Sequence, residues 1–153
     1  MYHKPLGDLV TLADVRSTNA CQAGRDWYSS MYRSDNLPTF AELIDMLAFH
    51  KHFDWITWML ISVYSFDSHW GSVFKHVDDF ATDFIDQRRE RRQLWTGVKD
   101  DAYYEVASKF RLNLLFTACE LDYKFPVKLP KYGQKIYDEA LQYIIEQRGD
   151  AHA

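Results

Sequence analysis

Hydrophobic residues recur at intervals of three and four along most of this chain, the spacing that places them on one face of an α-helix. Helix breakers are rare, since only six Gly and four Pro occur in 153 residues. These two features predict an all-α fold, and the length fits one domain with a real core. We therefore expect residues 1–153 to form a compact single-domain bundle of about six to seven helices.

Polar capping residues indicate where these helices begin. The strongest signal is a capping box formed by Thr39 and Glu42 directly after Pro38, which opens a helix to about His50. Other helices are expected in five further ranges: 12–16 after Thr11, about 20–32 after Asn19 with Gln22 as its capping-box partner, about 55–65 after Asp54, about 100–121, and from the loop 122–133 to about Arg148, where Gly149 ends the helix.

The longest helix is predicted over about residues 68–96, at the centre of the bundle. Apolar residues follow a spacing of three and four from Trp70 to Ile85, and Gly97 can end the helix. Residues 67–86 carry five Asp and one Lys, whereas residues 87–92 carry four Arg and one Glu. Acidic residues early and basic residues late in a helix complement its dipole, so the charge pattern has a purely structural interpretation.

The arginine cluster also supports a second interpretation, as a binding surface. Four arginines within five residues leave no apolar side to pack against a core, so this turn is expected to project from it. Exposed arginines beside a Trp are typical of a protein-binding hot spot. We predict these partner-binding residues: Arg88, Arg89, Arg91, Arg92 and Trp95.

A second basic stretch, "YKFPVKLPKYGQKIY" over residues 123–137, contains four Lys and no acidic residue. Its lysines alternate with aromatic rings, a composition that can bind single-stranded nucleic acid or an acidic protein surface. We predict Lys124, Lys128 and Lys131 as partner-binding residues. The competing interpretation is a loop stiffened by proline whose rings cover the core.

The stretch "ACQAGRDW", residues 20–27, combines four small residues with a Trp at its end. On a helix, Ala20, Cys21 and Gly24 share a face with Trp27, so a second helix could pack closely there. Trp55 and Trp58 lie three residues apart on a helix that is apolar on nearly every side, which predicts a central position for it. Cys21 and Cys119 are expected to be reduced, buried thiols.

The pattern Ala20-Cys21-x-x-Gly24-x-x-Trp27, followed by Asp54-Trp55-x-x-Trp58-x-Leu60, resembles one found in many small proteins encoded by bacteriophages and other mobile elements. The resemblance covers about residues 11–63, including the lead-in "TLADVRSTNACQAG", and Phe53 stands where those proteins usually have Gly or Arg. It implies a phage origin. Because most such proteins have no assigned activity, it implies no catalytic residue.

Sequence signatures of catalysis or of phosphate binding are missing from the chain, which has no P-loop, no G-x-S-x-G and no H-E-x-x-H. His50 and His52 flank Lys51. On the central helix, His69 and His76 with neighbouring Asp79 and Asp83 offer a possible metal site. A small metal-dependent enzyme using these residues is therefore one alternative, although we predict no catalytic residue, metal or cofactor.

The net charge of −4 argues against non-specific nucleic-acid binding, which requires clustered positive charge. The apolar run 55–66 is too short to cross a bilayer and the N-terminus lacks a signal-peptide core, so we expect a cytoplasmic protein. Our first hypothesis is a non-enzymatic phage protein that inhibits or redirects a host macromolecular complex, for example an anti-defence or anti-CRISPR inhibitor. The alternative is a nucleic-acid-binding module that uses the stretches 88–92 and 124–135.

Overall fold

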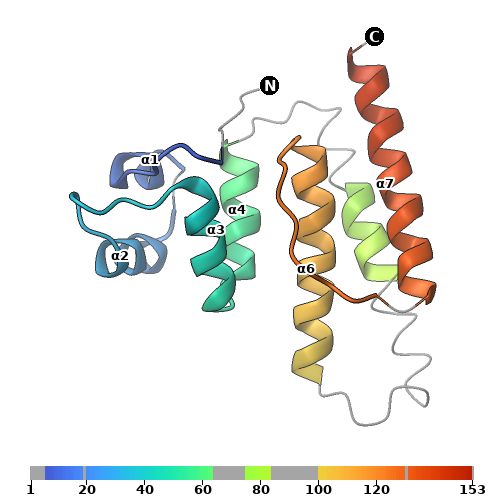
Figure 1. Cartoon of the computed structure of the whole chain (residues 1–153), viewed down its shortest axis with the longest axis horizontal. Coiled ribbons are helices and arrows are strands. Elements are labelled where there is room, and N and C mark those ends of the chain that lie inside the picture. Colours follow the sequence, from blue (N-terminus) through green and yellow to red (C-terminus); the bar gives the residue numbers. More distant parts are fainter. Residues whose placement is uncertain (1–5, 19, 64–74, 84–99, 130, 153) are drawn as a thin grey trace. The chain divides into compact units, whose positions relative to one another are not determined.

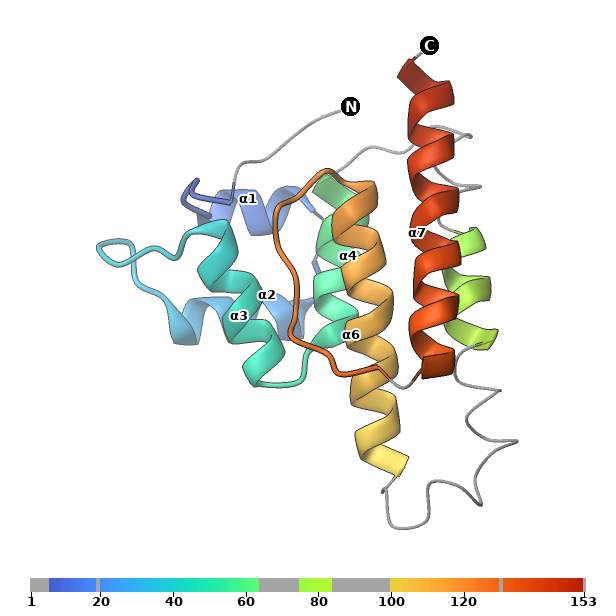
Figure 2. The same ribbon diagram turned by 45° about the vertical axis from the view of Figure 1, so that its right-hand side comes forward.

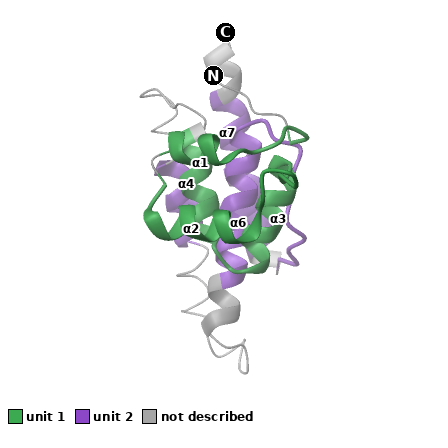
Figure 3. Cartoon of the chain, turned by 90° about the vertical axis from the view of Figure 1, so that its left-hand side faces the viewer, with its two compact units in different colours: residues 1–65 green, residues 66–153 purple. Residues whose placement is uncertain are grey.

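The computed structural model describes residues 6–18, 20–63, 75–83, 100–129 and 131–152 (Figure 1). Within these ranges the secondary structure is helical, apart from two isolated β-bridges, Leu9–Thr39 and Arg33–Asn36. The predicted all-α class is therefore confirmed. The chain divides into two compact units, residues 1–65 (unit 1) and 66–153 (unit 2), which Figure 3 colours separately. None of the helices in the described ranges is both long and apolar enough to span a membrane.

The described part of unit 1 contains four short helices, blue to green in Figure 1. They are α1 (Leu12–Ser17), α2 (Gln22–Met31), α3 (Phe40–Phe49) and α4 (Phe53–Val63). Helix α1 packs on α2, and α3 packs on α4. The connections are short, so each helix pair is close in sequence as well as in space.

Two capping boxes fix the starts of α1 and α3, where the sequence predicts Thr11 as a helix cap and Thr39 with Glu42 as a capping box. The hydroxyl of Thr39 accepts from the backbone N–H of Glu42 at 3.1 Å, and the Glu42 carboxylate accepts from the backbone N–H of Thr39 at 3.0 Å. These hydrogen bonds lower the pKa of Glu42, because they favour the charged carboxylate. Two otherwise unpaired donors at the helix start are thereby satisfied.

The start of α2 differs from the prediction. The helix begins at Gln22, with Cys21 in an extended N-cap conformation that makes no side-chain capping bond. The side-chain amide of Gln22 donates to Asp26 at 2.6 Å instead of closing a capping box. Asn19, the predicted cap, lies outside the described residues. Because Cys21 precedes the helix, its side chain is exposed, so the prediction of a buried thiol is wrong for Cys21 and confirmed for Cys119.

The N-terminal segment of unit 1 is held against the start of α3 by backbone hydrogen bonds. Val10 donates to the carbonyl of Pro38 at 2.9 Å, and Phe40 donates to the carbonyl of Asp8 at 2.8 Å. The buried hydroxyl of Tyr28 donates to the carbonyl of Val10. Burial raises the pKa of Tyr28, which keeps this donor protonated. These bonds bring α2, α3 and residues 8–10 around one apolar core.

Helix α4 does not have the buried position that its composition suggests. Phe53, Ile56 and Leu60 are buried on one face, whereas Trp58 and Ile61 remain 49% and 40% exposed. The helix begins at Phe53, so Asp54 lies in its first turn rather than at its cap. Helix α4 therefore has one core face and one open face.

The described helices of unit 2 are a segment at 75–83, α6 (Asp100–Ala118) and α7 (Lys131–His152), seen side by side in Figure 2. Helix α6 packs along α7. The prediction that Gly149 ends the last helix is wrong, since α7 continues through it to His152. Of the long helix predicted over 68–96, the described part is 75–83, and the remainder lies outside the described residues.

A buried amide ties the connection between α6 and α7 to α6. Asn113 is only 3% exposed; its side-chain N–H donates to the carbonyl of Phe125 at 3.1 Å, and its side-chain oxygen accepts from the N–H of Phe125 at 2.8 Å. The rings of Phe116, Tyr123 and Phe125 meet edge to face, with centroids 5.1 to 5.6 Å apart. The ring of Phe125 is buried, as the core-covering interpretation of this loop requires.

Helices α3 and α6 end in the same way although neither has a C-terminal Gly. Lys51 and Glu120 adopt a left-handed conformation, each with φ of 60°. The next residue in each case donates back to the helix: His52 to Leu47 at 2.8 Å, and Leu121 to Phe116 at 2.8 Å. This is the Schellman arrangement, which usually has Gly at the left-handed position.

Candidate functional site

A pocket of about 700 Å³ lies within unit 1, lined by side chains of α1 to α4. Its volume is within the range of roughly 300–1,000 Å³ that is usual for ligand-binding sites. The lining residues that the structure describes belong to unit 1, between Val10 and Ser62. They comprise a buried apolar floor, a wall of indole rings, a strip of small residues and a few polar groups.

The floor consists of residues that also form the core of unit 1. Tyr28 comes from α2, and Phe40, Leu43 and Leu47 come from α3. Each is at least nine-tenths buried. Because these side chains are fixed by core packing and by the Tyr28 bond to Val10, the floor of the pocket is rigid.

Three tryptophans form the wall. Trp27 on α2 and Trp55 on α4 are half-buried and meet edge to face, with ring centroids 6.1 Å apart. Trp58, one turn further along α4, is 49% exposed. Its indole N–H donates to the carbonyl of Thr18 at 3.1 Å, which fixes the orientation of an otherwise open ring.

Ala20, Cys21 and Gly24 line the pocket beside these rings. The expectation that a second helix packs tightly against these small residues is wrong, because there is open space over them. A Cβ added at Gly24 would meet only Cys21 Sγ at 3.6 Å and Ala20 Cβ at 4.0 Å, both ordinary contacts. The small residues therefore leave room for something that enters from outside unit 1.

The polar groups of the pocket are acidic or neutral. Asp14 on α1 and Asp54 on α4 are the charged residues of the described lining, which contains no Lys, Arg or His. Asp14 is partly buried and accepts a hydrogen bond from the backbone N–H of Thr11 at 2.9 Å. Asp54 is exposed. The pocket thus combines an apolar interior with negative charge at two of its lining helices.

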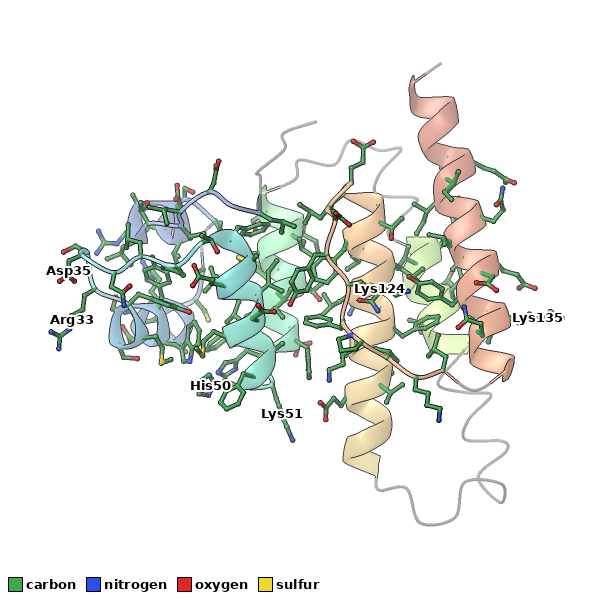
Figure 4. All side chains as sticks on the ribbon, in the orientation of Figure 1. Arg33, Asp35, His50, Lys51, Lys124 and Lys135 are labelled. Atoms are coloured by element: carbon green, nitrogen blue, oxygen red, sulfur yellow. The ribbon has the colours of Figure 1, made fainter. Side chains whose placement is uncertain are left out.

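Two histidines support the indole wall from outside the lining. The ring of His52 stacks on Trp55, with centroids 3.9 Å apart and planes 16° apart. The rings of His50 and His52 also contact Trp27 edge to face, at 5.9 and 5.7 Å. Burial, and then the nearby His50, lower the pKa of His52. Figure 4 shows His50 at the end of α3, next to Lys51.

The predicted partner-binding residues Lys124 and Lys128 are not among the lining residues of the pocket. Lys124 and Lys128 are exposed on the segment between α6 and α7, and Lys124 Nζ lies 5.3 Å from the centre of the Tyr137 ring (Figure 4). Lys131 is the first residue of α7, and its side chain is outside the described ones. Arg88, Arg89, Arg91, Arg92 and Trp95 also lie outside the described residues. The prediction that these groups bind a partner stays a prediction.

The residues of the alternative metal site are only partly described. His69 lies outside the described residues, and His76 is exposed with its ring 4.6 Å from that of Tyr143. Asp79 and Asp83 are exposed on the same helical segment. Within the part of the chain that the structure describes, no three His, Cys, Asp or Glu side chains come together as metal ligands would.

No known protein family, curated protein or solved structure matches this chain. The pocket itself is therefore the observation from which a function is inferred. Its sequence signal was the two patterns Ala20-Cys21-x-x-Gly24-x-x-Trp27 and Asp54-Trp55-x-x-Trp58, since all seven residues named in them are lining residues. The spacing of these residues did not indicate that the space beside them stays open.

Proposed function

We propose that this chain is a non-enzymatic, phage-encoded binding protein that inhibits or redirects a host macromolecular complex, in the manner of an anti-defence or anti-CRISPR inhibitor. The observation that supports the proposal is the pocket of unit 1. It is large, apolar and walled by three indole rings, the composition that dominates the energetic centres of protein interfaces. The phage-type sequence pattern of residues 11–63 coincides with its lining and supports the same inference.

Exposed apolar residues of unit 1, at the pocket wall and outside the lining, add to the proposed docking surface. Trp58 at the pocket wall is half exposed, and Phe49 at the end of α3 is 79% exposed, with its ring 5.2 Å from that of His50. Met31 at the end of α2 is 37% exposed. Large apolar side chains that remain open around a concave site are typical of a surface that is covered by a partner.

A second candidate function is nucleic-acid binding, and the arrangement of Lys124 and Lys128 favours it. Both are exposed on the segment that follows α6, and Lys124 Nζ lies 5.3 Å from the centre of the Tyr137 ring. Binding through these lysines would weaken steeply as salt is raised, because it depends on neutralising phosphates. Docking through an apolar pocket depends much less on salt.

Affinity purification from the bacterial host with matched variants tests the proposal. The tagged wild-type protein should recover one host assembly in near-stoichiometric yield. Gly24→Leu, which places a large side chain in the pocket, should lose it. Ala23→Leu adds the same side chain at an exposed neighbouring position outside the lining, so it should retain the assembly. The purified assembly should then lose or change its activity when wild-type protein is added.

Three results would contradict the proposal. One is recovery of no assembly, and another is an assembly whose activity is unchanged by the bound protein. The third is equal recovery of the assembly with Gly24→Leu and Ala23→Leu, which would show that the pocket is not part of the interface. The second candidate would be favoured instead if the tagged wild-type protein recovered nucleic acid and the Lys124→Ala and Lys128→Ala variants failed to recover it.

A further inference from the structure

We propose that residues 11–18, which contain helix α1, form a flap that opens independently of the other helices of unit 1 and thereby widens the pocket for the partner. This inference rests on the proposed docking function and specifies how access to the same site is controlled. Three observations support it: α1 has no buried side chain, it forms part of the pocket wall, and its two ends are held in different ways.

Helix α1 packs on α2 (Figure 1) but contributes no side chain to the buried core of unit 1. The other three described helices of unit 1 each contribute buried side chains: Tyr28 from α2, Phe40, Leu43, Ile44 and Leu47 from α3, and Phe53, Ile56 and Leu60 from α4. A helix of six residues is also too short to be stable alone in water. Because the free energy of local opening rises with the apolar area that opening exposes, α1 should open at much lower cost than α3 or α4.

The pocket is the part of unit 1 that such an opening changes. Asp14, Val15 and Ser17 on α1 and Thr18 at its end belong to the lining. When these residues move away, the pocket becomes a groove between α2, α3 and α4. Its floor stays in place, because the floor belongs to the core. A groove that is open along one side admits a chain segment of a partner more readily than a pocket with walls on four helices.

The chain on the N-terminal side of α1 is fixed to the core. Val10 is only 4% exposed. Its N–H donates to the carbonyl of Pro38 at 2.9 Å, and its carbonyl accepts from the hydroxyl of Tyr28. These contacts hold Val10 in place when α1 moves, so the hinge of the flap lies directly after Val10.

A single side-chain hydrogen bond from α4 reaches the other end of the flap. The indole Nε1 of Trp58 donates to the carbonyl of Thr18 at 3.1 Å. Trp58 is 49% exposed, so water can replace both partners of this bond when it breaks. The net free energy of such an exchange is small. The bond therefore acts as a latch that can release without disturbing the core.

The capping box of α1 keeps the flap helical and provides a way to loosen it from outside the pocket. The hydroxyl of Thr11 accepts from the N–H of Asp14 at 3.1 Å, and the Asp14 carboxylate accepts from the N–H of Thr11 at 2.9 Å. Thr11 is not a lining residue, so Thr11→Ala leaves the described lining unchanged. Thr39 forms the same box on α3, a helix with four buried residues, so Thr39→Ala is a matched control.

Amide hydrogen exchange of the purified full-length protein, followed residue by residue by NMR, tests the flap without a partner. The amides of Val15 and Thr18, which donate within the flap, should be at least about tenfold less protected than those in the middle of α3. Thr11→Ala should speed exchange in the flap about fivefold, the effect of losing a helix cap, and should leave α3 and α4 unchanged. Thr39→Ala should leave exchange in the flap unchanged.

The latch is tested in the same exchange experiment. Trp58→Phe keeps an aromatic ring and removes the N–H that Thr18 accepts, so it should speed exchange in the flap about threefold. Trp55→Phe makes the same ring change on the same helix, away from the Thr18 carbonyl, and should not speed it. Equal effects of the two variants would overturn the latch.

Entry of the uncharged apolar dye Nile red tests whether the flap controls access to the pocket. Its fluorescence rises in apolar surroundings, and stopped-flow mixing gives its association rate. The part of the signal that Gly24→Leu abolishes is binding in the pocket. That part should appear about fivefold faster with Thr11→Ala than with the wild type or Thr39→Ala. The host assembly recovered by the wild-type protein should also associate faster with Thr11→Ala than with Thr39→Ala.

The outcomes separate this inference from the proposed function. Flap amides that exchange as slowly as those of α3, or equally in Thr11→Ala and Thr39→Ala, would show that α1 belongs to the core and would overturn the flap. Equal rates of dye entry in these two variants, or no dye binding in the pocket, would overturn its control of access. A host assembly that is not recovered would contradict the proposed function, whereas faster exchange and faster dye entry with Thr11→Ala would still support a flap on the pocket.

Discussion

Each unit of this protein contains a cluster of three aromatic rings, and the two clusters are used differently. In unit 2, Phe116, Tyr123 and Phe125 interlock edge to face, and Phe116 and Phe125 are almost fully buried. In unit 1, Trp27, Trp55 and Trp58 stand around a pocket, and all three remain partly exposed. The first cluster closes a core, whereas the second borders a space.

The difference arises from the groups beside the rings. The rings of unit 2 surround a backbone segment that is fixed by two hydrogen bonds to the buried amide of Asn113. The indoles of unit 1 border the small residues Ala20, Cys21 and Gly24, which leave the space unfilled. Aromatic content alone therefore does not distinguish a packing cluster from a binding cluster. The neighbouring small and hydrogen-bonding residues do.

The largest effect is expected from removing the amide that closes unit 2. Asn113→Ala leaves the N–H and carbonyl of Phe125 without their partner in the interior, which should lower the free energy of unfolding by about 2–4 kcal/mol. Gln134→Ala removes an exposed side-chain bond to Asp138 on α7 and should cost at most about 0.5 kcal/mol. Urea unfolding followed by circular dichroism measures both. Equal costs would show that Asn113 does not hold this cluster together.

The next effect is a gain in stability at the pocket of unit 1. Gly24→Ala should raise the free energy of unfolding by about 0.5–1 kcal/mol, since Ala favours a helix interior over Gly. The added methyl group meets only ordinary contacts in the pocket. Urea unfolding gives the value. A loss of stability would mean that the space over Gly24 is filled in solution, and the contrast between the two clusters would fail.

A smaller gain is expected where α3 ends. Lys51 has a φ of 60°, a conformation that costs a residue with a Cβ about 1–2 kcal/mol and costs Gly very little. Because Gly also loses more entropy on folding, Lys51→Gly should stabilise the protein by a net amount of about 0.5 kcal/mol. Lys51→Ala keeps the strained conformation and should change little. A Gly variant no more stable than the Ala variant would exclude the left-handed conformation.

The smallest effect is a pH dependence from the ring that supports Trp55. Burial lowers the pKa of His52 below its unfolded value of 6.5, so protonation favours the unfolded state. The stability contributed by neutral His52 is present above that value and is lost as pH falls through the lower folded pKa. His52→Gln should therefore flatten the loss of stability below about pH 6.5, as measured by urea midpoints across the range. An unchanged slope would contradict the buried position of His52.

Features that depend on neighbouring residues in the chain were predictable from the sequence. The capping boxes at Thr11 and Thr39 need only residues three positions apart, and both form. Features that depend on distant contacts were not predictable. The partner of Asn113 is the backbone of Phe125, twelve residues later, and nothing in the helical pattern marks that amide. The left-handed conformations that follow α3 and α6 were not predictable, because Lys51 and Glu120 stand where Gly is usual.

The sequence predicted that several lining residues of the pocket share a helix face, but it assigned them to helix packing and not to a binding site. Helical spacing placed Ala20, Cys21, Gly24 and Trp27 together, and all four line the pocket. Spacing shows which residues share a face, yet it does not show whether another helix covers that face. The start of α2 at Gln22 also helps to keep the pocket open, because it leaves Cys21 exposed instead of packed. The open pocket is thus a property of the tertiary structure.

The account is tested most directly by the indole N–H signals of Trp27, Trp55 and Trp58 in a ¹⁵N NMR spectrum. Gly24→Leu places a large side chain in the pocket and should shift all three signals, while the backbone signals of α6 and α7 stay in place. Ala23→Leu adds the same side chain at an exposed position outside the lining and should leave the three indole signals nearly unchanged. Indole signals that do not move while other parts of the chain respond would contradict a binding pocket in unit 1.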